Sequence, residues 1–264
     1  TYGCHAKELV AYLKSVSPKV LILNGDVIDG WAFSKRYFPN SHMAVLSEFF
    51  KMMKKGTQVI YITGNHDEFL RKYTDLSMGN LFLTDKYLLE IEGKKHWIFH
   101  GDVFDHTTSG GAKFIAKLGG MGYDWLILVN RAINWILEKF GKGKVSLSKK
   151  VKNSVKKAVK FIGDFEKKAT EIAINNHYDY VICGHIHQPA DKIWTTEKGS
   201  VHYLNSGDWI ENLSWLEYNH GEWSLKFFNE KDFEKPIIEK NDISVNMEEL
   251  IHPKVFAEFA TQKV

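Results

Sequence analysis

The stretch "LILNGDVIDGW", residues 21–31, places a short apolar run directly before two carboxylates, Asp26 and Asp29. Residues 6–16 before it carry apolar side chains at helical spacing, and residues 20–23 have the composition of a short buried strand. The spacing therefore predicts a helix followed by a strand that ends in acidic residues. Because an unpaired buried carboxylate is costly, such a strand end predicts a compensating cation.

The helix-then-strand order recurs along the chain and predicts a mixed α/β fold, with parallel units first and antiparallel ones later. Met43–Met53 has the pattern of a helix, Gly56 ends it, and Val59–Ile62 has the pattern of a strand. Further strands, most of them in hairpins, are expected over Tyr87–Ile91, Lys95–Phe99, Tyr180–Cys183, Lys192–Thr196, Val201–Asn205, Leu213–Tyr218 and Trp223–Phe228.

The middle of the chain, from about Ala112 to Asn176, has helical patterns and no strand pattern. One apolar stripe runs from Phe114 to Phe140, and a second runs from Val151 to Ile172. The opposite face of the second stripe carries a row of lysines between 149 and 168. Two interpretations stay open for this face: it is solvated, or it lies against anionic lipid headgroups or substrate phosphate.

Composition limits the class of protein. The chain has 264 residues, 44% hydrophobic and 25% charged, as in an ordinary folded domain. The formal net charge of +3 does not indicate a nucleic-acid partner. Cys4 and Cys183 are the only cysteines, which argues against a thiolate metal cluster and favours a reducing compartment. The most apolar run, Trp125–Leu137, is shorter than the roughly 20 residues of a membrane span. We therefore expect a cytoplasmic protein.

Four expected strands end in residue types that can bind metals. In an open α/β sheet these carboxyl ends share one edge, where binding sites form. His185 and His187 are two residues apart, so both rings face the same way in an extended segment. Imidazole, carboxylate and amide groups without thiolate suit Mn²⁺, Fe or Zn²⁺ better than Ca²⁺. The four strand ends are Asn24-Gly25-Asp26, Gly64-Asn65-His66-Asp67, His100-Gly101-Asp102 and Gly184-His185-Ile186-His187.

Together these four motifs resemble those of the calcineurin-like metallophosphoesterase superfamily. The resemblance implies a four-layer αββα sandwich with a helical lid and two divalent metals, with Mn²⁺ expected first and Fe or Zn²⁺ as alternatives. It also implies that Asp26 bridges the two metals and that His187 serves one of them. The ligands implied for the other metal are Asn65, His100 and His185.

The same resemblance assigns catalysis to the segment after the second strand. His66 would protonate the leaving oxygen or stabilise the phosphoryl oxyanion, and Asp67 would orient His66. The Asp-x-His block that normally follows the first strand of the superfamily, and supplies further metal ligands, is not found before Asp26. Either sequence upstream of Thr1 supplies it, which the strandless beginning without Met favours, or the protein is a degenerate relative with one metal.

A narrower resemblance concerns the substrate. Gly30-Trp31, the helical middle and Tyr203–Trp209 are similar to the UDP-2,3-diacylglucosamine diphosphatase group of lipid A biosynthesis. This similarity implies hydrolysis of a nucleotide-linked glycolipid to UMP and an acylated sugar 1-phosphate, on the inner membrane surface. His66 departs from the best-studied branch of that group, which has arginine there. Candidate substrate contacts are Arg71, Lys113, Arg131, Asn205 and Asp208.

These patterns predict a discontinuous core formed by residues 1–106 and 177–235. Residues 107–176 would form the helical lid, and residues 236–264 would form a tail. Two alternative functions stay open. One is a phosphodiesterase or phosphatase that acts on another small molecule in solution. The other is a non-catalytic scaffold with the same fold, which the absent Asp-x-His block suggests.

Overall fold

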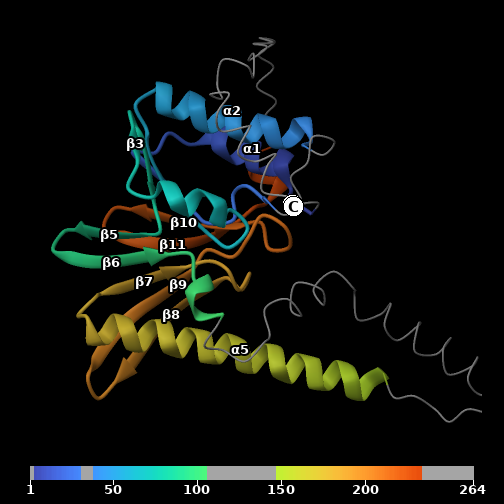
Figure 1. The fold of residues 1–264 in the computed structure, drawn as a ribbon, viewed down its shortest axis with the longest axis vertical. Helices are drawn as coiled ribbons and strands as arrows, with labels where there is room; N and C mark the ends of the chain where they lie inside the picture. Colours follow the sequence, from blue (N-terminus) through green and yellow to red (C-terminus); the bar gives the residue numbers. More distant parts are fainter. Residues whose placement is uncertain (1–2, 31–37, 106–146, 234–264) are drawn as a thin grey trace, which may run out of the picture. The chain divides into compact units, whose positions relative to one another are not determined.

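The computed structural model describes residues 3–30, 38–105 and 147–233, and its first half forms a four-stranded sheet flanked by two helices (Figure 1). Strands β1, β2 and β4 are parallel, and β3 is antiparallel to β4, in the order β1-β2-β4-β3. The elements are α1 (Ala6–Ser15), β1 (Val20–Asn24), α2 (Asn40–Lys54), β2 (Gln58–Ile62), the 3₁₀ helix η1 (Glu68–Tyr73), β3 (Ser77–Met78) and β4 (Leu81–Thr84).

The second half forms a five-stranded sheet and a separate hairpin. Strands β6, β7 and β9 are parallel, and the antiparallel strands β5 and β8 close the two edges in the order β5-β6-β7-β9-β8. The elements are β5 (Lys86–Ile91), β6 (Lys94–Phe99), the 3₁₀ helix η2 (Asp102–Phe104), α5 (Leu147–Asn175), β7 (Tyr180–Cys183), β8 (Ala190–Thr196), β9 (Gly199–Asn205), the hairpin of β10 (Ser214–Asn219) with β11 (Glu222–Phe227), and the 3₁₀ helix η3 (Glu230–Asp232).

The two sheets pack face to face through aliphatic side chains. Ile60 and Ile62 of β2 meet Ile98 of β6 and Ile182 of β7, and all four are buried. On the outer face of the first sheet, α1 and α2 pack against each other and against β1. Because side chains alternate along a strand, Leu21 and Leu23 of β1 point to the helices, and Ile22 points to the second sheet.

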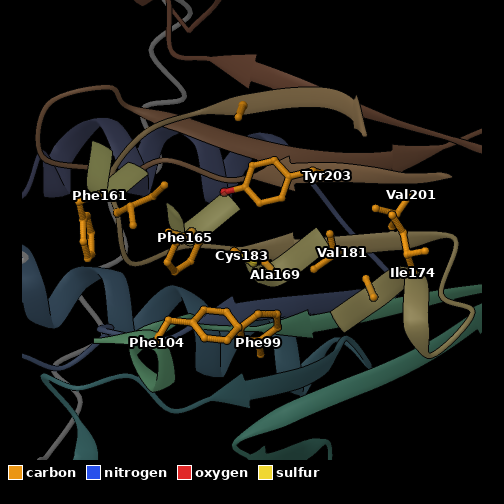
Figure 2. Packing of buried hydrophobic residues seen from close by; sticks show 13 residues of the cluster. Phe99, Phe104, Phe161, Phe165, Ala169, Ile174, Val181, Cys183, Val201 and Tyr203 are labelled. Carbon is orange, nitrogen blue, oxygen red and sulfur yellow. The ribbon is translucent and has the colours of Figure 1, made fainter. Parts of the chain in front are cut away.

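The outer face of the second sheet is covered by α5 (Figure 2). Phe165 and Ala169 of α5 are fully buried against Val181 of β7 and Tyr203 of β9. An ion pair between Glu166 and Lys192 of β8 also ties the helix to the sheet, with Oε1 and Nζ 2.7 Å apart. The described residues therefore lie in the order helices, sheet, sheet, helix.

The expected mixed α/β fold is confirmed, and each strand and helix predicted within the described residues is present with shifts of a few residues at its ends. Two short strands, β3 and β4, were not predicted. The first apolar stripe, residues 114–140, lies outside the described residues. The second stripe is α5. In the described part of the chain, no helix is both long enough and apolar enough to cross a membrane.

Candidate metal centre and active site

The predicted convergence of strand ends is present for three of the five predicted ligands. Asp26 follows β1, His100 follows β6 and His185 follows β7, and one ligand atom from each lies within 4.8 Å of the other two. Nε2 of His100 lies 3.1 Å from Oδ2 of Asp26 and 3.3 Å from Nδ1 of His185. Two imidazole nitrogens and a carboxylate oxygen thus face one small volume, as the ligands of a divalent ion do.

Each imidazole of the centre has its other nitrogen engaged, so the nitrogen that faces the centre is fixed. Nδ1 of His100 lies 2.9 Å from the Asn24 carbonyl oxygen, to which it can only donate. Nε2 of His185 lies 2.8 Å from Oδ1 of Asp105. A donor bond of this kind leaves the opposite nitrogen with a lone pair, which is the usual arrangement of metal-binding histidines. The centre is therefore built for a cation.

The backbone at the ligands is unusual. Asp26, His185 and His187 have φ angles of 55°, 64° and 53°, in the left-handed region that side chains rarely adopt. Such conformations cost free energy and persist where the surrounding structure imposes them, often at functional sites. The turns therefore serve to direct these three side chains rather than to minimise backbone energy.

Close approach at glycine and an unsatisfied amide also fit a bound ion. A Cβ at Gly64 would lie 2.7 Å from the Asp26 backbone nitrogen and 2.9 Å from the His100 ring. Only glycine lets β2 end against these ligands. The buried Oδ1 of Asn65 has no hydrogen-bond partner among the described residues. A bound cation is one partner that would satisfy such an oxygen, which fits the predicted role of Asn65 as a ligand.

The electrostatics of the centre favour an ionised Asp26. Burial opposes its charge, but the hydrogen bond and charge of His100 outweigh burial and hold the pKa of Asp26 below its usual range. Burial likewise opposes a charged His100, yet Asp26 raises the pKa of that imidazole. The carboxylate is thus anionic across the physiological pH range and available to a metal.

His66 lies beside the metal ligands. Its backbone nitrogen donates to Oδ1 of Asp26 at 2.9 Å, and Nδ1 of its ring lies 3.0 Å from Oδ1 of Asp29. We expected Asp67 to orient His66, and the structure corrects this. Asp67 is fully buried, and its carboxylate accepts hydrogen bonds from the Tyr61 hydroxyl and the backbone nitrogens of residues 27 and 64. Asp67 thus holds the loops, and Asp29 holds the ring.

His187 is more exposed than Asp26, His100 or His185, with 40% of its side chain accessible. Its Nδ1 lies 2.7 Å from Oδ2 of Asp208. Oδ1 of Asp208 accepts hydrogen bonds from three consecutive backbone nitrogens, those of residues 210–212. Burial opposes the charge on Asp208, but His187 and these amides keep its pKa below the usual range. Asp208 is therefore bound to protein groups through both oxygens.

The remaining predicted substrate contacts fare differently. Asn205 is fully buried, donates to the Gly184 carbonyl oxygen and accepts from the Gly207 nitrogen, so contact with substrate is wrong for this residue. Nη2 of Arg71 lies 2.6 Å from Oδ2 of Asp102, and about a third of the Arg71 side chain is exposed. Arg71 lines a cavity of about 2460 Å³ that also reaches the metal ligands. The candidates Lys113 and Arg131 lie outside the described residues.

Two carboxylates of the site were not singled out as functional from the sequence. Asp105 contacts His185, and Asp29 contacts His66. Asp29 follows Asp26 by three residues, so its position in the same loop was a usable signal. Asp105 had no comparable signal, because its contact joins segments 80 residues apart.

Comparison with known proteins places the chain in a family. Residues 4–189 match the family described as calcineurin-like phosphoesterase. The UDP-2,3-diacylglucosamine hydrolase of Aliivibrio fischeri is 25% identical over 213 residues, covering 80% of this chain and 86% of that protein. The enzyme of the same name from Shigella sonnei is 27% identical over 172 residues, covering 64% and 69%. The chain belongs to the calcineurin-like phosphoesterase family, whose members are metal-dependent hydrolases.

Among solved structures, a phosphodiesterase described as novel and archaeal is similar at 15% identity and a TM-score of 0.39, covering 84% of this chain and 93% of that one. A Vps29 mutant from Entamoeba histolytica is similar at 12% identity and a TM-score of 0.33, covering 84% and 89%.

Proposed function

We propose that this protein hydrolyses the pyrophosphate bond of UDP-2,3-diacylglucosamine, releasing UMP and an acylated sugar 1-phosphate, with two Mn²⁺ ions. The observation that carries the hydrolase part is the convergence of Asp26, His100 and His185 on one small volume. The substrate rests on the relatives named UDP-2,3-diacylglucosamine hydrolase, which are 22–27% identical in sequence.

The residues of the site divide the work. Asp26, Asn65, His100 and His185 would hold one ion, and Asp26 with His187 would contribute to a second. Bound together, two divalent ions neutralise phosphate charge and lower the pKa of a water molecule that acts as the nucleophile. The protein's own part is to fix the ligands before substrate arrives, through the bonds of each ring to a carbonyl or carboxylate.

His66 is the proposed general acid. Because Asp29 engages Nδ1, the other ring nitrogen is the one that can give a proton to the leaving phosphate oxygen. The side chain is 29% exposed and lines the same cavity as Asp26 and His187, so a substrate phosphate can reach it. Asp29 would keep the ring orientation constant through the reaction.

We further propose that α5 helps the enzyme meet its lipid substrate at an anionic surface. Lys156 and Lys160 are exposed, and Val159 between them is 64% exposed, so charge and apolar surface lie side by side. Phe161 and Phe165 already belong to the core. The lid function would therefore fall to the part of residues 107–176 that precedes Phe161.

The test is to incubate the full-length protein with Mn²⁺ and UDP-2,3-diacylglucosamine and to measure UMP by chromatography, with His185→Gln as the inactive control. UMP release by wild type alone supports the proposal. Turnover of soluble phosphodiesters without UMP release would remove the lipid substrate and leave the hydrolase. Charge reversal of Lys156 and Lys160 should reduce activity on substrate in vesicles and spare activity on a soluble ester.

A second candidate is a phosphodiesterase that acts on a small soluble phosphate ester. The observation that favours it is His66, an imidazole backed by Asp29, where the best-studied lipid branch is expected to have arginine. A histidine that can donate a proton suits an ester whose leaving oxygen needs one. The soluble ester in the same assay distinguishes the two candidates.

A further inference from the structure

The contact between His187 and Asp208 suggests a role for Asp208 that the substrate prediction missed. Asp208 follows β9, a strand that carries none of the predicted metal ligands, and reaches His187 across the loops after β7 and β9. The Asp208 side chain is 7% exposed, whereas that of His187 is 40% exposed. The carboxylate is therefore more deeply buried than the ring that it contacts.

The two oxygens of Asp208 have separate partners. Oδ1 accepts from the backbone nitrogens of residues 210, 211 and 212 at 2.9, 2.7 and 3.0 Å. Oδ2 lies 2.7 Å from Nδ1 of His187 and 3.3 Å from Nδ2 of Asn212. The same Asn212 amide donates to the His187 carbonyl oxygen at 2.9 Å. The side chain and the backbone of His187 are thus both held by one rigid turn.

Resting on the function proposed above, we propose that Asp208 is a positioning residue that fixes the proton of His187 on Nδ1 and keeps the lone pair of Nε2 directed to a divalent ion. A carboxylate without a proton can only accept, so the imidazole must donate through Nδ1. His187 has a left-handed backbone, with φ at 53°, and needs this support more than a residue in a strand would.

Two substitutions separate positioning from simple structural support. Asp208→Asn retains an oxygen for the three backbone nitrogens, but its amide group then donates to His187 and drives the ring proton to Nε2, where it blocks the ion. Asp208→Ala removes the bonds to the turn and leaves the His187 ring able to carry its proton on either nitrogen. Positioning predicts that asparagine impairs metal binding more than alanine does, while alanine lowers thermal stability more than asparagine does.

Asp191→Asn on β8 is the matched control. Asp191 also contacts a histidine ring, with Oδ1 2.5 Å from Nε2 of His202, but on strands away from the metal ligands. This variant makes the same aspartate-to-asparagine change beside a histidine ring, away from the centre. It should bind Mn²⁺ as wild type does.

The experiment measures Mn²⁺ binding to the full-length protein by electron paramagnetic resonance and the His187 tautomer in metal-free protein by ¹⁵N NMR. We expect roughly 10- to 100-fold weaker Mn²⁺ binding at one site in Asp208→Asn, with the Nε2–H tautomer, and the Nδ1–H tautomer in wild type. Wild-type affinity in Asp208→Asn, or an Nε2–H tautomer in wild type, overturns the proposal. A wild type that binds no Mn²⁺ instead defeats the proposed function, while the tautomer still reports on Asp208.

Discussion

Oδ1 of Asp29 lies 3.0 Å from Nδ1 of His66, and this contact couples the loop after β1 to the loop after β2. The loop after β1 also carries Asp26, which accepts a hydrogen bond from the His66 backbone nitrogen. The proposed acid and the proposed bridging ligand are therefore fixed relative to each other by two short connections. This geometry sets the first prediction.

Replacing His66 with alanine should lower turnover by roughly 10² to 10⁴ while leaving Mn²⁺ content unchanged, because the ring supplies a proton and no metal ligand. Steady-state kinetics and metal analysis of the same preparation check both parts. Asp29→Asn should lower turnover less than His66→Ala does. If His66→Ala loses metal, the residue is a ligand and not an acid.

A methyl group at Gly64 should disrupt the centre. The added Cβ would lie 2.7 Å from the Asp26 backbone nitrogen, so Gly64→Ala should weaken Mn²⁺ binding and cost about 1–3 kcal/mol of unfolding free energy. Gly163→Ala on α5 is the matched control, because its Cβ meets nothing within 4 Å. That change should stabilise by about 0.5–1 kcal/mol in urea unfolding. Equal effects of the two substitutions would contradict the close approach at Gly64.

Bound metal should stabilise the fold. An ion that binds only the folded state at 100 times its Kd raises the unfolding free energy by about 2.7 kcal/mol. Thermal unfolding in Mn²⁺ and in EDTA measures the shift. His185→Gln should abolish most of it, since the variant lacks one of the three convergent ligands. A shift that survives in His185→Gln would place the ion elsewhere.

His96 should make the free energy of unfolding depend on pH. Burial lowers the pKa of its imidazole below the ordinary 6.5. Nδ1 lies 3.2 Å from the Leu89 carbonyl oxygen, and Nε2 has no partner among the described residues. The folded state therefore favours the neutral ring. Because the folded pKa is the lower one, this stabilisation is complete above the unfolded pKa and is lost as pH falls below it.

His96→Phe should flatten this loss, as measured by urea unfolding at pH 7 and pH 5, since phenylalanine cannot bind a proton. His177→Asn, which replaces an exposed imidazole after α5, should retain the wild-type slope. His177 has a φ of 56°, a conformation that asparagine tolerates. An unchanged slope in His96→Phe would show that other groups control the acid response.

The sequence was informative where a local pattern has one spatial outcome. Parallel strands of one sheet end at a common edge, so the motifs after β6 and β7 could be placed together from their order. Asp26 follows β1 of the other sheet, and only the face-to-face packing of the two sheets brings it to them. Side-chain partners could not be assigned in this way. Asp67 and Asp29 are both acidic residues near His66, and only the fold shows that Asp67 is buried against Tyr61. Likewise, Asn205 is buried and donates to the Gly184 carbonyl oxygen after β7, a contact that its own sequence neighbours do not reveal.

The left-handed backbones of Asp26, His185 and His187 also bear on how this chain could change. Glycine at any of these positions would relax the main chain, so selection for stability alone would tend to erase the site. Aspartate and histidine at these three positions therefore carry a backbone cost that glycine would not, and the proposed metal centre would account for that cost.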